Sequence, residues 1–258
     1  MKTFTTMLKN KNRRTELIIG VPFLLLIWHL IAMGVGNINI FPTPLAVIGS
    51  LANIVTSPNF FTVVTMTLSR VLVGLTLSFC LALILGLISV NSRFVKSMLN
   101  PLVSVMKAIP TIAITVQLII WLGPFQAPPA VGFIVIFPLL YSAVVEGLEN
   151  IDLDIIEMAN VYNVPKVHRI KHIYYPSVVS YLSAALAGSI GLCIKVIISA
   201  EYISTTRNSM GDGIYYGFAY FDMAEVWSWA VVAIMTSAVL ELPLRQLKKR
   251  ICQWREVD

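Results

Sequence analysis

Six runs of predominantly apolar residues constrain the fold of this chain more than any other feature. They cover residues 17–36, 64–90, 101–122, 128–148, 178–200 and 226–244. Because an α-helix rises about 1.5 Å per residue, about 20 apolar residues are needed to cross the hydrocarbon core of a bilayer. The runs are continuous rather than alternating, which favours helices over the strands of a β-barrel. The sequence therefore predicts an all-α polytopic membrane protein, with residues 1–258 forming a single transmembrane domain of six spans.

The charge content supports the same class of protein. Only 12% of the residues are charged, whereas soluble domains carry about 25%. The run 101–122 departs most from this pattern, because Lys107, Pro110 and Gln117 interrupt it. The first run follows a basic arm, and we interpret it as an uncleaved span. A signal peptide cleaved near the small-residue triplet Ala32-Met33-Gly34 is the alternative.

Positive charges occur in alternate loops. They lie in the N-terminal arm, at Arg93 and Lys96, in the stretch 157–176, and in the tail from Arg245. The intervening loops are uncharged or mainly acidic, and Trp121, Trp227 and Trp229 border them. Loops rich in Lys and Arg stay in the cytosol, and tryptophan favours membrane interfaces. Both termini are therefore predicted to be cytosolic.

The first outer loop contains a segment that two structures would fit. Apolar residues from Leu45 to Val55 recur at near-helical spacing after the sequence Phe41-Pro42-Thr43-Pro44. This spacing predicts an amphipathic helix lying at the outer surface. A plain connecting loop is the alternative.

The stretch 157–176 is the longest strongly polar segment between apolar runs. Asp152 and Asp154 precede it, and negative charge suits the start of a helix. Asn163 tolerates the left-handed conformation that ends helices, and Pro165 suits the first turn of another. The sequence therefore predicts two short helices joined by a sharp turn, which would form a rigid docking device facing the cytosol.

Residues for catalysis or metal binding are not apparent. The three histidines, His29, His168 and His172, show no metal-ligand spacing with carboxylates. The phosphate-binding motif G-x-x-x-x-G-K-[ST] does not occur either. The chain is therefore not expected to be an enzyme, to bind a metal, or to hydrolyse ATP by its own sequence.

The polar stretch resembles the EAA loop of bacterial ABC-importer permeases, written E-A-A-x-x-x-G-x9-I-x-L-P. Glu157, Ala159, Ile173 and Pro176 match the motif at its spacing. Met158 replaces its first alanine, Asn163 its glycine and Tyr175 its leucine. Other landmarks are similar to the nitrate/sulfonate/taurine branch of these permeases. They are Phe41-Pro42-Thr43-Pro44, Ser69-Arg70 with Gly74, Ala108-Ile109-Pro110, Trp121-Leu122-Gly123, Ala200-Glu201 with Gly211 and Gly213, and Trp254.

This resemblance implies a fold, a location and partners. The fold would be that of a type I ABC importer permease, similar to the methionine importer, in the bacterial cytoplasmic (inner) membrane. The partners would be a second copy of the chain, two cytosolic ABC ATPase subunits that hold ATP and Mg, and an extracytoplasmic solute-binding protein; no nucleic acid is implied. The loop 151–176 would couple the spans to the ATPase. Its expected coupling residues are Glu157, Met158, Ala159, Asn163, Pro165, Ile173 and Pro176.

The resemblance also implies a range of solutes. The branch takes small anions such as nitrate, sulfonates, taurine and bicarbonate, and vitamin precursors such as pyrimidines. Two other classes of function are alternatives. An ATP-independent carrier or channel would work without an ATPase partner, and a membrane-embedded enzyme lacks candidate catalytic residues.

Polar residues within the spans are candidates for the translocation path. Lys195 would favour an anionic or carbonyl-bearing solute, because a lysine inside a span is costly and marks function. The alternatives are snorkelling to the outer interface or pairing with Glu201 or another polar group. Gln117, Thr111 and Thr115 are the other path candidates, although polar residues also pack between helices. Arg70 is interpreted as an anchor of its helix or the partner of a carboxylate, and substrate binding is the alternative.

Overall fold

The computed structural model describes residues 20–252, with side chains described to residue 242. The basic arm before residue 20, and Trp254 and Arg255 in the tail, lie outside the described residues. A helix at Gly20–Val35 comes first. The helices after it are α2 (Pro44–Thr56), α3 (Phe60–Asn91), α4 (Arg93–Ala108), α5 (Thr111–Leu122), α6 (Ala127–Glu149), α7 (Leu153–Val161), α8 (Lys166–Arg169), the π-helical turn η1 (Ile170–Tyr174), α9 (Tyr175–Ser204), α10 (Met210–Ala219) and α11 (Met223–Cys252).

The described chain divides into two compact units. The larger unit comprises Phe61–Asp212 and the part of the chain from Val232, and the smaller comprises the part through Phe60 with Gly213–Val231. The prediction of a single domain stays a prediction.

Helices α6 and α9 form the centre of the larger unit. A buried cluster joins Leu118 of α5 to Val131 of α6 and to Val196 of α9. The helix backbones approach closely where glycine removes a side chain. A Cβ atom at Gly147 of α6 would lie 3.0 Å from the Cα atom of Val178 in α9. Small residues allow close packing of this kind between membrane helices.

Four helices in the described part of the chain are long and apolar enough to cross a membrane. They are Phe60–Asn91, Ala127–Glu149, Lys166–Ser204 and Met223–Leu242. They contain the predicted spans 64–90, 128–148 and 178–200, and most of 226–244. The helix Gly20–Val35, within the predicted span 17–36, is apolar but shorter than these four helices over its described residues. The count of six spans and the cytosolic termini stay predictions.

The predicted span 101–122 is not one straight helix. Helices α4 and α5 meet at an angle of 102°, and they count as a fifth candidate span only if the bent pair is taken together. The break lies at Ile109 and Pro110, whose ψ angles of 131° and 126° are extended. Proline disfavours the helical conformation of the residue before it and lacks the N–H that would continue the helix. Pro110 therefore accounts for the bend.

The smaller unit contains the helix predicted in the first outer loop. Thr43 caps α2 by accepting a hydrogen bond from the Ala46 N–H at 3.3 Å, and Pro44 occupies the first turn. A helix at this position is confirmed, and a plain loop is wrong. The Trp28 indole packs against that of Trp227 with ring centroids 5.4 Å apart. Trp229 is buried against the protein, and its predicted place at the outer membrane interface stays a prediction.

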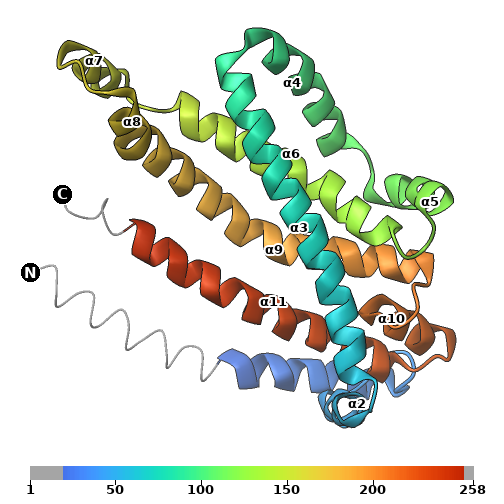
Figure 1. Cartoon of the computed structure of the whole chain (residues 1–258). Helices are drawn as coiled ribbons and strands as arrows, with labels where there is room; N and C mark the ends of the chain where they lie inside the picture. Colours follow the sequence, from blue (N-terminus) through green and yellow to red (C-terminus); the bar gives the residue numbers. More distant parts are fainter. Residues whose placement is uncertain (1–19, 253–258) are drawn as a thin grey trace, which may run out of the picture. The chain divides into compact units, whose positions relative to one another are not determined.

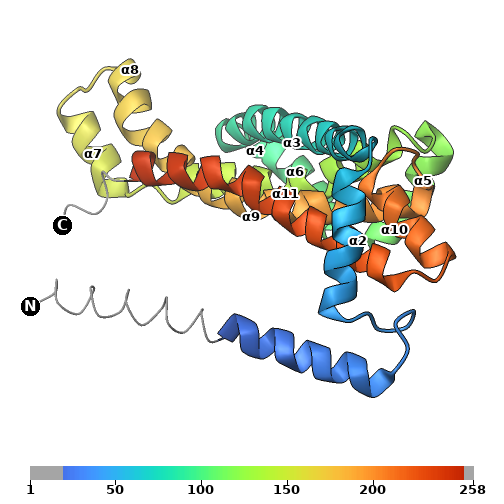
Figure 2. The same ribbon diagram turned by 90° about the horizontal axis from the view of Figure 1, so that it is seen from below.

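Helices α7 and α8 lie at one end of the larger unit, and α5 lies at the opposite end of α6 in both views (Figures 1 and 2). The chain passes from α6 through α7 and a turn into α8, and then along α9. The polar stretch predicted to be a docking device therefore projects beyond the ends of two long apolar helices.

Candidate functional site

The polar stretch begins with the short helix α7. Asp152 caps it, because its side chain accepts a hydrogen bond from the Asp154 N–H at 3.0 Å. Asp154 lies in the first turn, where a carboxylate interacts favourably with the helix dipole. The predicted role of these two acidic residues at the helix start is confirmed.

A Schellman motif ends α7. The Val164 N–H donates to the Ala159 carbonyl at 3.0 Å, and the Asn163 N–H donates to the Asn160 carbonyl at 3.1 Å. These two bonds define the motif, which requires a residue in the left-handed conformation between them. Asn163 has a φ angle of 48°. The prediction that Asn163 ends the helix in this conformation is therefore confirmed.

The Arg169 guanidinium holds the turn closed. Its Nε donates to the Val164 carbonyl at 2.7 Å, and its Nη2 donates to the Ala159 carbonyl at 2.8 Å. Its Nη1 donates to the side-chain oxygen of Asn160. Arginine presents several donors in a rigid, planar arrangement. One side chain of α8 therefore joins both sides of the turn after α7, and no local pattern in the sequence predicts this role.

The expected coupling residues occupy different environments. Ala159 is buried, Ile173 is half-buried, and Glu157 and Met158 are exposed. Pro165 caps α8, and Pro176 lies in the first turn of α9. The structure thus brings the residues of the EAA-like motif into one helical hairpin. The hairpin consists of α7, the turn after it and the start of the helix Lys166–Ser204. Its alanine, Ala159, is buried, and the neighbouring Glu157 and Met158 are exposed.

The second half of the hairpin differs from the prediction. Instead of a separate short helix, Lys166–Ser204 forms one helix of 39 residues that includes the fifth predicted span. The π-helical turn η1 lies within it, directly before Tyr175 and Pro176. Pro176 has no N–H to donate to an earlier carbonyl, so an interruption of the α-helical ladder is expected near it. Displacement of α8 would therefore act directly on α9.

The loop 151–176, which contains the hairpin, exposes several large apolar side chains. Val161 is 77% exposed and Tyr162 is 76% exposed. The others are Leu153, Ile155, Met158, Val167 and Ile170. Charged residues such as Glu157, Lys166 and Lys171 alternate with them and are also exposed. A mixed surface of this kind at the tip of a rigid hairpin is typical of a protein–protein contact.

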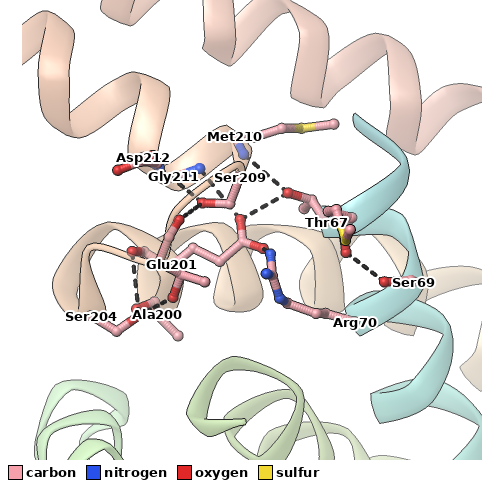
Figure 3. Close-up of polar contacts among 12 residues, drawn as sticks. Thr67, Ser69, Arg70, Ala200, Glu201, Ser204, Ser209, Met210, Gly211 and Asp212 are labelled. Atoms are coloured by element: carbon pink, nitrogen blue, oxygen red, sulfur yellow. Dashed lines mark hydrogen bonds and ion pairs between the residues drawn. The ribbon is translucent and has the colours of Figure 1, made fainter. Parts of the chain in front are cut away.

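A second site is a buried ion pair, in the larger unit. Figure 3 shows Arg70 and Thr67 of α3 and the start of α10 converging on Glu201 near the end of α9. The Arg70 Nη1 lies 2.7 Å from the Glu201 Oε1, and the side chains are 11% and 0% exposed. The favoured interpretation of Arg70, pairing with a carboxylate, is confirmed.

The other carboxylate oxygen of Glu201 is also satisfied. It accepts hydrogen bonds from the Thr67 hydroxyl at 3.0 Å and from the Gly211 N–H at 3.3 Å. The same hydroxyl accepts from the Met210 N–H at 3.0 Å. A Cβ atom at Gly211 would lie 2.4 Å from the Cβ of Glu201, so only glycine fits here. Glu201 therefore fastens α3, α9 and the start of α10 to one another.

The expected path residues do not form one cluster in the structure. Thr115 is buried, and its hydroxyl donates to the Thr111 carbonyl at 2.8 Å, so these two lie together on α5. Gln117 of α5 and Lys195 of α9 are exposed. Pairing of Lys195 with Glu201 is not found among the described residues, because Arg70, Thr67 and Gly211 engage that carboxylate. A path role for the four residues stays a prediction.

The helices and the hairpin define a class of protein: a multi-span membrane protein with a rigid, exposed segment between two spans. Residues 74–251, more than half of the chain, match the model of the family described as the binding-protein-dependent transport system inner membrane component. The chain belongs to this family, and the resemblance to ABC-transporter permeases is confirmed.

Relatives of the chain are also named as permease proteins. The chain is 21% identical over 233 residues to the putative aliphatic sulfonates transport permease protein SsuC of Bacillus subtilis, covering 89% of this chain and 83% of that protein. It is 26% identical to the nitrate import permease protein NrtB of Synechococcus elongatus, covering 76% and 77%. It is 22% identical to a putative ABC transporter permease protein of Methanocaldococcus jannaschii, covering 96% of both chains.

Two solved structures have a similar fold. One is the MetNI methionine ABC transporter in inward facing conformations, with a TM-score of 0.61, 14% identity, and coverage of 75% of this chain and 96% of that one. The other is an amino acid ABC transporter with histidines, with a TM-score of 0.64, 15% identity, and coverage of 78% and 97%. The expected similarity to the fold of the methionine-importer permease is confirmed.

Proposed function

We propose that this chain is the membrane-spanning subunit of an ATP-driven importer and that its hairpin 157–176 receives the stroke of a separate ATPase. One observation carries the proposal: the hairpin is rigid, presents exposed apolar side chains, and is continuous with a long apolar helix. The bonds of Arg169 and the motif at Asn163 supply the rigidity. A partner that moves this hairpin would therefore move α9 directly.

The chemistry of the hairpin surface favours a protein partner over solvent or lipid. Burying Val161, Tyr162 and Val167 would remove large apolar side chains from water, which is favourable by about 25 cal/mol per Å². The neighbouring charges would remain at the rim of such a contact, as they do in protein interfaces. We assign the apolar side chains to a groove of the ATPase subunit.

The complete importer would contain two copies of this chain, two cytosolic ATPase subunits that bind ATP and Mg, and an extracytoplasmic solute-binding protein. Membership of a binding-protein-dependent transport family supports this composition. The location would be the bacterial cytoplasmic membrane, with both termini in the cytosol. No step of ATP hydrolysis would take place on this chain.

The solute would be small and would carry an acid group, such as a sulfonate, nitrate, taurine or bicarbonate. The names of the sulfonates and nitrate permeases among the relatives support an anion. Lys195 supports it as well, because it is an exposed lysine in a predominantly apolar helix. A vitamin-precursor molecule such as a pyrimidine is the alternative solute class. Lys195 would line the path with Gln117, Thr111 and Thr115.

Co-purification tests the assignment of the hairpin. The tagged full-length subunit, purified in mild detergent from its native host, should retain a nucleotide-binding protein identified by mass spectrometry. Val161→Glu should lose that protein, because a charge would replace an apolar contact, and Glu157→Lys should weaken it or uncouple transport. Leu45→Glu is the matched control: Leu45 is 72% exposed on α2, close to the 77% of Val161, but lies outside the hairpin.

The results separate the importer from its rival. Retention of the ATPase by wild type and Leu45→Glu, but not by Val161→Glu, supports the proposed contact. If wild-type subunit purifies without any nucleotide-binding protein and still transports solute, the chain is an ATP-independent carrier or channel. If Glu157→Lys and Val161→Glu both transport normally, the hairpin does not couple the ATPase to the spans.

A further inference from the structure

An open cavity of about 480 Å³, the chamber, lies between α4, α6 and α9 in the larger unit, and several of the residues that line it, Lys107 and Glu146 among them, are exposed. This volume falls in the range of about 300–1,000 Å³ that is typical of small-molecule sites. Its polar lining consists of Lys107 from α4, Ser142 and Glu146 from α6, and Tyr181 and Ser189 from α9. The residues Ser142, Glu146 and Tyr181 place the cavity toward the end of α6 and the start of α9, where α7 and α8 lie (Figure 1).

The cavity contains one positive and one negative side chain. The Lys107 Nζ donates a hydrogen bond to the Ser142 hydroxyl at 2.8 Å, which fixes the ammonium group at the wall. Glu146 follows Ser142 by four residues, about one helical turn or 6 Å along α6. Within residues 20–242 the Glu146 carboxylate has no ion-pair partner, whereas Glu149 nearby pairs with Lys96. Opposite charges therefore line one chamber without neutralising each other directly.

The cavity shares a helix face with Lys195. Exposed residues recur along α9 at positions 184, 188, 192, 195 and 199, at intervals of three or four residues. Gly188 lines the cavity. Lys195 follows it by seven residues, which places it on the same face about two turns, or about 10 Å, further along. A solute moving along this face of α9 would meet Lys195 and then enter the chamber.

We infer that this chamber binds a small zwitterion, an acid group and an ammonium group a few atoms apart. This inference rests on the proposed function, because it names the solute class that the path carries. The acid group would bind the Lys107 ammonium beside the Ser142 hydroxyl. The ammonium group would bind the Glu146 carboxylate, which would repel a simple anion. The hydroxyl groups of Tyr181 and Ser189 supply further hydrogen-bonding positions.

The charge arrangement distinguishes this solute from its two halves. A simple anion would gain the contact with Lys107 but would approach the carboxylate of Glu146 without a compensating charge. A simple cation would gain Glu146 and approach Lys107. A charge-assisted hydrogen bond is worth enough to change affinity by about tenfold or more. A zwitterion should therefore bind at least about tenfold more tightly than either half-molecule.

Calorimetric titration of the full-length subunit in lipid nanodiscs tests the inference with three probes. Taurine carries both groups, ethanesulfonate carries only the acid, and ethanolamine carries only the amine. Taurine should bind saturably, with both other probes at least about tenfold weaker. Glu146→Gln should weaken taurine binding by about tenfold and leave ethanesulfonate binding unchanged or tighter. Lys107→Met should weaken the binding of both taurine and ethanesulfonate.

Matched variants make the result interpretable. Lys96→Met removes a lysine whose partner, Glu149, does not line the chamber, and it should leave taurine binding unchanged. Lys107→Gln keeps a hydrogen-bond donor and serves as the second variant if Lys107→Met does not fold, as judged by thermal unfolding. Equal binding of taurine and ethanesulfonate with no effect of Glu146→Gln would overturn the zwitterion assignment. Absence of taurine binding to folded wild-type subunit would overturn it too.

The titration tests the chamber, and the co-purification tests the importer, so either proposal can be refuted without the other. Binding is measured on the isolated subunit, without any ATPase. Taurine binding that depends on Lys107 and Glu146 supports the chamber even if no ATPase co-purifies. An ATPase that co-purifies with a subunit that binds no taurine supports the importer and refutes the chamber.

Discussion

The buried pair of Arg70 and Glu201 allows a stability prediction with a defined magnitude. Substituting Arg70→Met removes the guanidinium 2.7 Å from a carboxylate that is 0% exposed. Breaking a buried ion pair by removing one partner costs about 3–5 kcal/mol, because the remaining charge is buried without compensation. The Thr67 hydroxyl and the Gly211 N–H still donate to the other oxygen of Glu201. We therefore expect Arg70→Met to lower the free energy of unfolding by about 3 kcal/mol, near the lower end of that range.

The second substitution, Glu201→Gln, should relieve part of that loss. A glutamine at this position has no charge to leave unpaired, and its carbonyl oxygen keeps an acceptor for Thr67 and Gly211. The double variant should therefore lose less free energy of unfolding than the sum of the losses in Arg70→Met and Glu201→Gln. The difference should be about 0.5–3 kcal/mol.

Reversible unfolding in mixed micelles, followed by tryptophan fluorescence, gives the free energy of unfolding of each variant. Arg93→Met is the matched control: Arg93 is exposed at the start of α4, so its loss should change stability by less than about 0.5 kcal/mol. The reasoning is refuted if Arg70→Met costs no more than Arg93→Met. Strict additivity in the double variant would refute it as well.

Two further predictions concern the backbone. Gly211→Ala should strongly reduce the yield of folded subunit in size-exclusion chromatography, because a Cβ would lie 2.4 Å from the Glu201 Cβ and 2.5 Å from the Tyr202 nitrogen; Gly188→Ala, with nothing within 4 Å of its Cβ, should have little effect. Asn163→Val should destabilise the hairpin by about 1–2 kcal/mol, because a β-branched residue disfavours the φ of 48°, whereas Asn163→Gly should be tolerated. Hydrogen exchange of the Val164 amide measures this effect, and equal protection in the two Asn163 variants would contradict it.

Residue patterns with local causes could be predicted from the sequence. The long apolar runs indicated the helices, and the acidic start of α7 and the left-handed Asn163 followed from residue preferences alone. The break of the span 101–122 at Pro110 was also available locally, since proline and the residue before it disfavour a helix.

Contacts between distant residues could not be predicted in the same way. The Arg169 guanidinium donates to the carbonyl of Ala159, ten residues earlier, and no periodicity in the sequence predicts such a bond. Arg70 and Glu201 are 131 residues apart. Each is a charged residue in or beside an apolar run, and the cost of leaving charges unpaired suggests that such residues pair. The choice of partner depends on how α3 and α9 pack, which local preferences do not determine.

The chamber beside α4 could not be predicted from local sequence patterns either. Lys107 and Glu146 are separated by 39 residues and lie near the ends of different helices, where a charge usually faces solvent. The bend at Pro110 allows α4 to run apart from α5. Only packing shows that Lys107 reaches Ser142 at 2.8 Å rather than extending into solvent.

The most direct test of the central claim measures uptake and ATP hydrolysis together in proteoliposomes. The vesicles would contain the subunit with its co-purified ATPase, with the solute-binding protein outside and ATP supplied to the ATPase side. The account predicts uptake that requires ATP, is retained in Leu45→Glu, and is lost in Val161→Glu although that subunit remains folded. ATP-independent uptake by wild type, or undiminished ATP-driven uptake by Val161→Glu, would contradict it.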